Sequence, residues 1–236
     1  MSQESMSMRA FMGYVGKRLK AGSISLIKFL LILTLILVLL NFLNILPVSM
    51  LLKYIFRNEA TERLAQIGYR ASVEELTQLI QEGADVNVKV NYRGMEMTPL
   101  MLKASFYPNL EALRLLIKNS AKVNATDKSG YTALMWAVMM GMGDSVPEIL
   151  QTLIDNGAKV DAVDMYGQTA LMKAVKRVMF SPEILQILLD NGADAAIKDN
   201  EGKRALDYAE KNRELKGTNA YYLLREKTLA AANSLP

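Results

Sequence analysis

The sequence contains neither cysteine nor histidine among its 236 residues. Without cysteine it cannot form a disulfide, a thiol nucleophile or a thiolate metal site. Without histidine it lacks the commonest general base near neutral pH and the commonest metal ligand. These two absences exclude Ser-His and Cys-His catalysis and a zinc site with nitrogen or sulfur ligands.

Sequence motifs for other kinds of catalysis are missing as well. There is no Gly-rich phosphate loop of the Walker type and no G-x-S-x-G nucleophile turn. Asp127, Asp164 and Asp199 recur at a regular interval, which is typical of turn-forming residues rather than of a pair of catalytic acids. We therefore expect no enzyme, no catalytic residue, no metal, no cofactor and no small-molecule substrate.

The positive charge is confined to the N-terminus. Residues 1–28 contain five Lys or Arg and one Glu, so this segment alone accounts for the net charge of +4. Residues 29–52 carry no charge, and the basic and acidic residues of 53–236 cancel. Because the larger part of the chain has no basic excess to neutralise phosphates, we do not expect nucleic acid as a partner.

Residues 29–52 form the longest run without a charged residue. A helix of this length spans about 36 Å, which exceeds the ~30 Å hydrocarbon core of a bilayer. A buried helix of a soluble core is one alternative, but such helices are rarely apolar on all sides. A cleaved signal peptide is another, but no small-residue cleavage site follows the run. The pattern favours an uncleaved transmembrane signal anchor, preceded by a basic interfacial or disordered segment over residues 1–28.

The distribution of basic residues predicts the orientation of this anchor. Five Lys or Arg precede the span, and four follow it over a similar distance, namely Lys53, Arg57, Arg63 and Arg70. By the positive-inside rule the N-terminus is expected in the cytoplasm. The chain is then a single-pass protein of the inner or plasma membrane, with residues 58–236 outside it, in the periplasm if the source is a Gram-negative bacterium.

Two phased series of motifs run through residues 83–207. The first reads GADVN, SAKVN, GAKVD and GADAA, starting at residues 83, 120, 157 and 192. The second reads TPLM, TALM, TALM and RALD, starting at residues 98, 132, 169 and 204. Both series repeat at 34 to 37 residues, which is typical of solenoids built from helical repeats.

Each repeat carries the signals of two helices. Thr98, Thr132 and Thr169 precede apolar helical patterns, where a hydroxyl group can cap the first backbone amides. Pro99 suits the first helical position, because its missing N–H costs nothing there. A second apolar pattern with helical spacing follows over residues 110–118, 148–154 and 183–189.

The segments DKSGYTALMWAV (127–138) and DMYGQTALMKAV (164–175) carry the specific match to a known family. Over about residues 60–215 the sequence resembles the ankyrin repeats, here of a bacterial type. The resemblance implies an all-α solenoid of helix-turn-helix units with finger-like turns, placed after the single transmembrane helix. The expected units are 58–97 (an N-terminal cap with an inserted finger), 98–131, 132–168, 169–203 and 204–236 (a C-terminal cap).

Two departures from the family pattern lead to further expectations. Met101, Met135 and Met172 stand where the family has a histidine that ties neighbouring repeats by hydrogen bonds, so apolar packing is expected there. Three residues are inserted between Gly83 and Thr98, and further ones near 141–147. Insertions in a repeat map to loops on one face, often the binding face.

The resemblance also implies where a partner binds, namely at the finger tips and first helices on the concave side. The matching positions are Tyr92, Arg93, Phe106, Lys128, Tyr131, Trp136, Met165, Tyr166, Gln168, Lys173, Lys176 and Arg177. Trp136, the single tryptophan, is the first candidate, because tryptophan dominates interface hot spots. Its alternative role is a partly buried packing residue between repeats.

We expect a membrane-anchored scaffold, accessory or immunity-type protective factor that holds one protein partner, whose identity the sequence leaves open. The alternative is a small subunit of a membrane complex in which the transmembrane helix itself does the work. Asn41 and Asn44 motivate this alternative, because amides in hydrocarbon seek partners on other helices.

Overall fold

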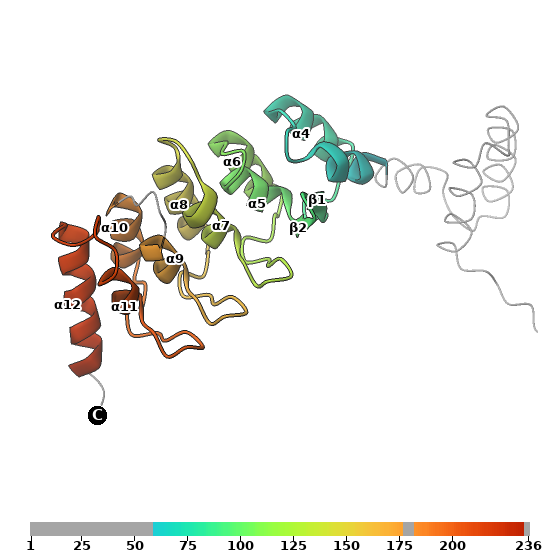
Figure 1. Ribbon diagram of the computed structural model, residues 1–236. Helices are drawn as coiled ribbons and strands as arrows, with labels where there is room; N and C mark the ends of the chain where they lie inside the picture. Colours follow the sequence, from blue (N-terminus) through green and yellow to red (C-terminus); the bar gives the residue numbers. More distant parts are fainter. Residues whose placement is uncertain (1–58, 177–181, 234–236) are drawn as a thin grey trace, which may run out of the picture. The chain divides into compact units, whose positions relative to one another are not determined.

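A computed structural model describes residues 59–176 and 182–233 (Figure 1). The chain divides into two units, Met1–Ile55 and Phe56–Pro236, and the described residues belong to the second. Segment 1–28, the predicted membrane span over 29–52 and Arg177 lie outside them. Across 59–176 and 182–233, none of the helices is sufficiently long and apolar to traverse a bilayer.

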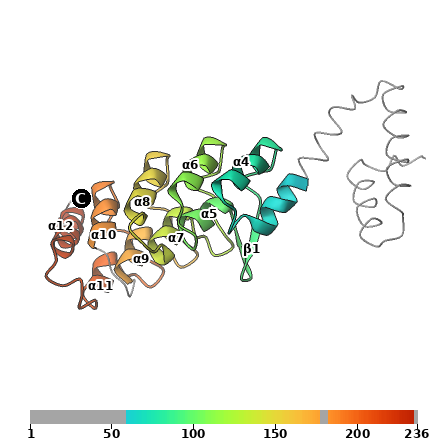
Figure 2. The same cartoon turned by 90° about the horizontal axis from the view of Figure 1, so that it is seen from above.

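The described residues form five helix pairs stacked side by side (Figures 1 and 2). The pairs are 59–67 with α4 (Val73–Gln81), α5 (Pro99–Ala104) with α6 (Leu110–Lys118), α7 (Ala133–Met140) with α8 (Val146–Asp155), α9 (Ala170–Lys176) with α10 (Pro182–Asp190), and α11 (Ala205–Ala209) with α12 (Asn219–Asn233). The inner helices α5, α7, α9 and α11 pack in one row, and the outer helices α4, α6, α8, α10 and α12 in another. The predicted arrangement of helical repeats is confirmed.

The predicted threonine caps begin three of the inner helices. The hydroxyl oxygens of Thr98, Thr132 and Thr169 each accept a hydrogen bond from the backbone amide three residues later, at 3.3 Å. Such caps satisfy amides that have no partner inside the helix. A short polar side chain in each repeat therefore fixes where the inner helix starts.

The three methionines at the family's histidine position lie in the core, with at most 1% of each exposed. Met101 also accepts a hydrogen bond, because the Thr98 amide donates to its sulfur across 3.5 Å. A thioether is only a weak acceptor. Apolar packing thus takes over at this position, as the sequence led us to expect.

The core is continuous from the second pair to the last, and the first pair is built differently. It has a separate small cluster, formed by Ala60, Leu64, Ala71, Leu76 and Leu79 together with Ala112 of α6. Buried Lys103 reaches back to this pair and donates to the carbonyl oxygen of Ala71 across 2.8 Å. Burial lowers the pKa of Lys103. The first pair is therefore held by polar contacts in addition to apolar ones.

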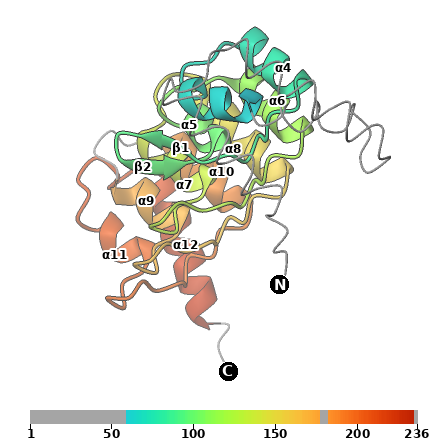
Figure 3. The same ribbon diagram turned by 90° about the vertical axis from the view of Figure 1, so that its right-hand side faces the viewer.

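The inserted segment before Thr98 is a β-hairpin, so the all-α description is incomplete there. Strands β1 (Val90–Tyr92) and β2 (Met95–Met97) lie side by side and pair antiparallel (Figure 3). They connect the first helix pair to the second. Arg93 and Gly94 form the turn with φ values of 51° and 84°. Two positive φ values are what a two-residue hairpin turn requires.

Candidate functional site

Three loop fingers precede the last three inner helices, over residues 124–131, 161–168 and 196–203, and project from one side of the stack (Figure 1). We call them the second, third and fourth fingers, the hairpin being the first. In the second finger one carboxylate oxygen of Asp127 accepts hydrogen bonds from the amides of Ser129 and Tyr131, at 2.8 and 3.0 Å. Asp164 and Asp199 make the same pair of bonds. The recurring aspartates are therefore turn formers, as their spacing predicts.

The second carboxylate oxygen of each aspartate receives a donor from nine residues later, on the inner helix. The donors are the Trp136 indole N–H at 2.9 Å, the Lys173 ammonium at 2.6 Å and the Tyr208 hydroxyl. Three chemically different side chains thus hold the same place in successive repeats. Each finger is locked to its own helix by this bond.

The fourth finger shows the electrostatic effect of this bond. Donation to the Asp199 carboxylate raises the pKa of Tyr208 to about 12. Burial alone would raise the pKa of Asp199, but the bonds from Tyr208 and from two backbone amides outweigh it and lower that pKa. Tyr208 therefore stays a neutral donor at any physiological pH.

Backbone hydrogen bonds join the loop fingers into one row. The Met165 amide donates to the Ser129 carbonyl and the Asn200 amide to the Tyr166 carbonyl, both across 3.0 Å. Gly167 allows this approach, because a Cβ atom there would lie 3.0 Å from the Asn200 amide nitrogen. We call the second, third and fourth fingers together the finger row. Because its members are hydrogen-bonded to one another, the finger row is a rigid surface rather than three independent loops.

The third finger differs from its neighbours at the tip. Val163, Met165 and Tyr166 are 50, 60 and 54% exposed, and we call these three residues the third-finger tip. Polar residues occupy the positions of Met165 and Tyr166 in the other two loop fingers, namely Lys128 and Ser129 in the second and Asn200 and Glu201 in the fourth. Apolar side chains held exposed on a finger whose neighbours are polar mark a candidate interaction site.

A protein-family model described as ankyrin repeats (3 copies) matches this chain over residues 64–164 and 143–230. The chain belongs to the ankyrin repeat family. A search of curated proteins gave no match. Ankyrin repeats suggest protein–protein interaction. Five of the predicted binding residues belong to the loop fingers of this ankyrin domain, namely Lys128, Tyr131, Met165, Tyr166 and Gln168.

Five of the predicted residues form a row within the ankyrin domain. Ring centroids are 4.9 Å apart for Tyr92 and Phe106, 5.5 Å for Phe106 and Trp136, and 5.2 Å for Trp136 and Tyr131. The Lys173 ammonium lies 4.2 Å from the Tyr131 ring centroid. Only 7% of Trp136 is exposed and its N–H is engaged by Asp127. This arrangement favours the packing role for Trp136.

The other described candidates lie at the surface. Arg93, Lys128, Met165, Tyr166 and Lys176 are exposed. Gln168 is half-buried, and its amide connects the third and fourth fingers by donating to Asp199 across 3.4 Å. The structure thus separates the twelve predicted residues into a packed row of four aromatic residues and Lys173, an exposed set of five that a partner can reach, half-buried Gln168, and Arg177, which lies outside the described residues.

Sequence reasoning missed a second set of links between the ankyrin repeats. Side-chain oxygens of Asn87, Asn124 and Asp161 accept hydrogen bonds from the backbone amides of the next repeat, at 2.7, 2.8 and 2.9 Å. All three occupy the fifth position of the GADVN motif. The corresponding residue of the last copy is Ala196, which has no further copy to bind. This contrast within the motif is the signal that could have revealed the role.

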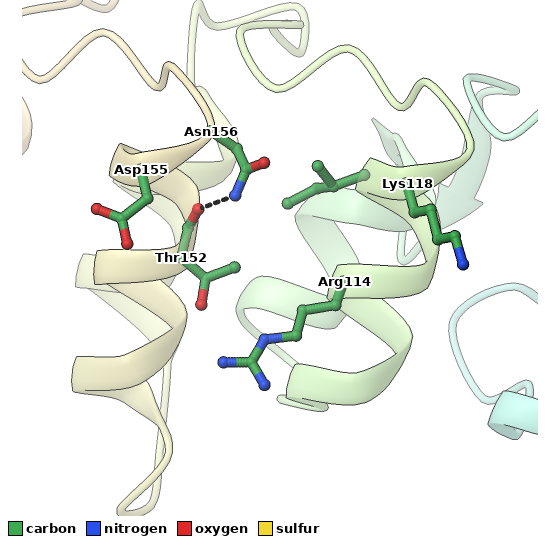
Figure 4. Close-up of a pocket in the computed structure, with 6 residues that line it drawn as sticks. Arg114, Lys118, Thr152, Asp155 and Asn156 are labelled. Atoms are coloured by element: carbon green, nitrogen blue, oxygen red, sulfur yellow. Dashed lines mark hydrogen bonds between the residues drawn. The ribbon is translucent and has the colours of Figure 1, made fainter.

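The outer helices carry a groove of about 500 Å³ between α6 and α8 (Figure 4). Its lining includes Arg114, which pairs with Glu148 at 2.9 Å, and Asn156, which donates to the Thr152 carbonyl at 2.8 Å. The polar groups of Arg114 and Asn156 are thus engaged within the protein. Over the described residues, no cluster of three or more Asp and Glu side chains is placed to hold a metal ion.

Proposed function

We propose that this ankyrin domain holds a protein partner through its finger row, with Met165 and Tyr166 at the centre of the contact. The observation that carries the proposal is the apolar third-finger tip between two polar fingers. Interface hot spots combine aromatic or methionine side chains at the centre with a polar rim that excludes water. The finger row has this composition.

The rigidity of the row supports the same function. Each finger is closed by an aspartate and joined to its neighbour by backbone hydrogen bonds. Binding then requires little ordering of the loops, and the entropy cost of association is reduced. A loop that served only as a connection would not need this many internal bonds.

The charges beside the tip favour a protein over an anionic membrane surface. Lys128 pairs with Glu96 at 3.3 Å, and Lys203 pairs with Glu201. Attraction to anionic lipids depends on unneutralised Lys and Arg near the surface. With these two lysines paired, fewer unneutralised cations remain beside the tip than an anionic membrane surface would require.

The proposed function includes a membrane tether. The uncharged run over 29–52 and the basic segment before it support a single-pass anchor with its N-terminus in the cytoplasm. The anchor would concentrate the ankyrin domain at the membrane surface, where its partner would be reached. A scaffold, an accessory factor and a protective factor all fit this arrangement.

Affinity capture from membranes tests the proposal. Full-length protein carrying Met165→Ser with Tyr166→Ser should lose a partner that the natural protein captures reproducibly. The matched control is Tyr222→Ser with Leu229→Ser, which removes equally exposed apolar residues from α12 (56 and 52% exposed). Retention of the partner by the third-finger variant and its loss from the α12 variant would overturn the proposal.

A further inference from the structure

Charge is divided unevenly between the two rows of helices. The outer helices α4, α6, α8 and α10 carry seven acidic residues, namely Glu74, Glu75, Glu111, Glu148, Asp155, Glu183 and Asp190, and two basic ones, Arg114 and Lys118. Outer helix α12 adds one acid, Glu226, and two basic residues, Arg225 and Lys227. The inner helices α5, α7, α9 and α11 carry three lysines and one acid, Asp207. An acidic molecule approaching the domain is therefore repelled by the outer helices.

Of the three inner-helix lysines, only Lys176 is exposed. Lys103 and Lys173 are buried. Lys103 donates a hydrogen bond to the Ala71 carbonyl, and Lys173 forms an ion pair with the Asp164 carboxylate. The Lys176 ammonium lies 3.3 Å from the Gln168 side-chain oxygen and 4.5 Å from the Tyr208 ring centroid. These contacts place a cation at the base of the third finger.

Lys176 has no carboxylate partner in the part of the chain that the structure describes. The two nearby aspartates are already occupied, Asp164 by Lys173 and Asp199 by Tyr208, and each also binds two backbone amides. Residues 177–181 (RVMFS) contain no acid either. The ammonium group is thus oriented by a ring and a side-chain amide oxygen, and no carboxylate of the described residues forms an ion pair with it.

We propose that Lys176 receives a carboxylate of the partner, and that the partner contributes an acidic segment whose apolar side chain contacts the third-finger tip. This inference rests on the proposed function and adds the chemistry of the partner to it. An exposed ammonium at the base of the finger that carries the apolar tip fits an Asp or Glu next to an aromatic or long aliphatic residue. A nucleic acid or an anionic membrane would need several unpaired cations.

A random peptide library displayed to the full-length protein in uncharged detergent tests this inference. Enriched peptides should carry net negative charge and at least one large apolar residue. Lys176→Gln should weaken binding of a synthetic enriched peptide about two- to fivefold, as expected for one partly exposed ion pair. Lys176→Glu should shift the enriched set towards basic peptides. The control Lys118→Gln removes the same charge from outer helix α6 and should leave the affinity unchanged.

The contrary outcomes distinguish the two proposals. Neutral or basic peptides that depend on Met165 and Tyr166 but not on Lys176 would overturn the acidic-partner inference and leave the finger-tip site in place. Enriched peptides that bind Met165→Ser/Tyr166→Ser as well as the natural protein would overturn the finger-tip site itself. Binding to vesicles containing phosphatidylserine that is lost with Lys176→Gln, without enrichment of acidic peptides, would contradict the choice of a protein segment.

Discussion

Trp136 donates its indole N–H to the Asp127 carboxylate across 2.9 Å, and this bond ties an inner helix to its finger. The residue that the sequence marks as the first candidate for binding is thus engaged inside its own repeat. In the next two repeats Lys173 and Tyr208 make the equivalent bond. The side chain at this inner-helix position differs between repeats, but its partner is always the finger aspartate, so its role is to stabilise the repeat. The residues at the finger tips have no such role and can differ between repeats to suit a partner.

The first prediction separates packing from binding at Trp136. Trp136→Phe keeps a ring in the aromatic row and removes the donor to Asp127. It should lower the free energy of unfolding by about 1–2 kcal/mol, because the carboxylate loses a partner. Trp136→Ala should cost about 3–5 kcal/mol, since it also leaves a cavity. Urea unfolding measures both, and partner capture by folded Trp136→Phe should be unchanged. Unaltered stability with lost capture would restore Trp136 as a binding residue.

A second prediction concerns the close contact between the third and fourth fingers. Gly167 and Gly202 have nearly equal φ values of 73° and 75°, but only at Gly167 would a Cβ atom collide with a neighbouring finger. Gly202→Ala should cost about 1 kcal/mol for its backbone strain alone. Gly167→Ala should cost about 2–4 kcal/mol, because the Asn200 backbone must also move. Thermal unfolding compares the two variants, and equal losses would show that the finger row is not closely packed.

A third prediction uses the raised pKa of Tyr208. The phenol ionises near pH 10 in the unfolded chain and at about 12 in the folded one. Because the folded state holds the proton more tightly, the stabilisation by Tyr208 is complete below about pH 10 and is lost as the pH rises towards 12. Tyr208→Phe should remove this part of the pH dependence. Denaturant unfolding at several pH values checks the difference, and identical alkaline profiles for both proteins would contradict it.

The fourth prediction tests the membrane tether. Leu37→Arg with Leu40→Arg places two charges in the middle of the 29–52 run. Each arginine raises the free energy of membrane insertion by about 2.5–3.5 kcal/mol. The variant should move from the membrane pellet to the supernatant after alkaline extraction, while the natural protein stays in the pellet. Persistent pelleting of the variant would contradict a transmembrane anchor.

Replacing residues 29–52 with an unrelated apolar helix distinguishes a passive anchor from the alternative in which the helix is the working element. We expect the exchanged protein to keep its partner, because recognition is assigned to the finger row. Loss of the partner, together with normal insertion, would favour a helix that pairs through Asn41 and Asn44.

The repeats, the threonine caps and the turn-forming aspartates could be predicted because each depends on residues close together in the sequence. The β-hairpin of residues 90–97 is not predicted, although Val90, Tyr92 and Met97 alternate with polar residues, because an insertion in a repeat indicates a longer loop and does not specify its secondary structure. The exposure of Tyr166 and the burial of Trp136 depend on neighbouring repeats. No local pattern in the sequence distinguishes these two aromatic residues.

The most direct test of the finger-row site is photo-crosslinking in living cells with p-benzoylphenylalanine at position 166, compared with position 222. Both positions carry exposed tyrosines, 54 and 56% accessible, so the probe is equally available at each. The account predicts a discrete crosslinked protein from position 166, lost when Met165 is changed to Ser, and none from position 222. A crosslink to the same protein from position 222 but not from position 166 would contradict it.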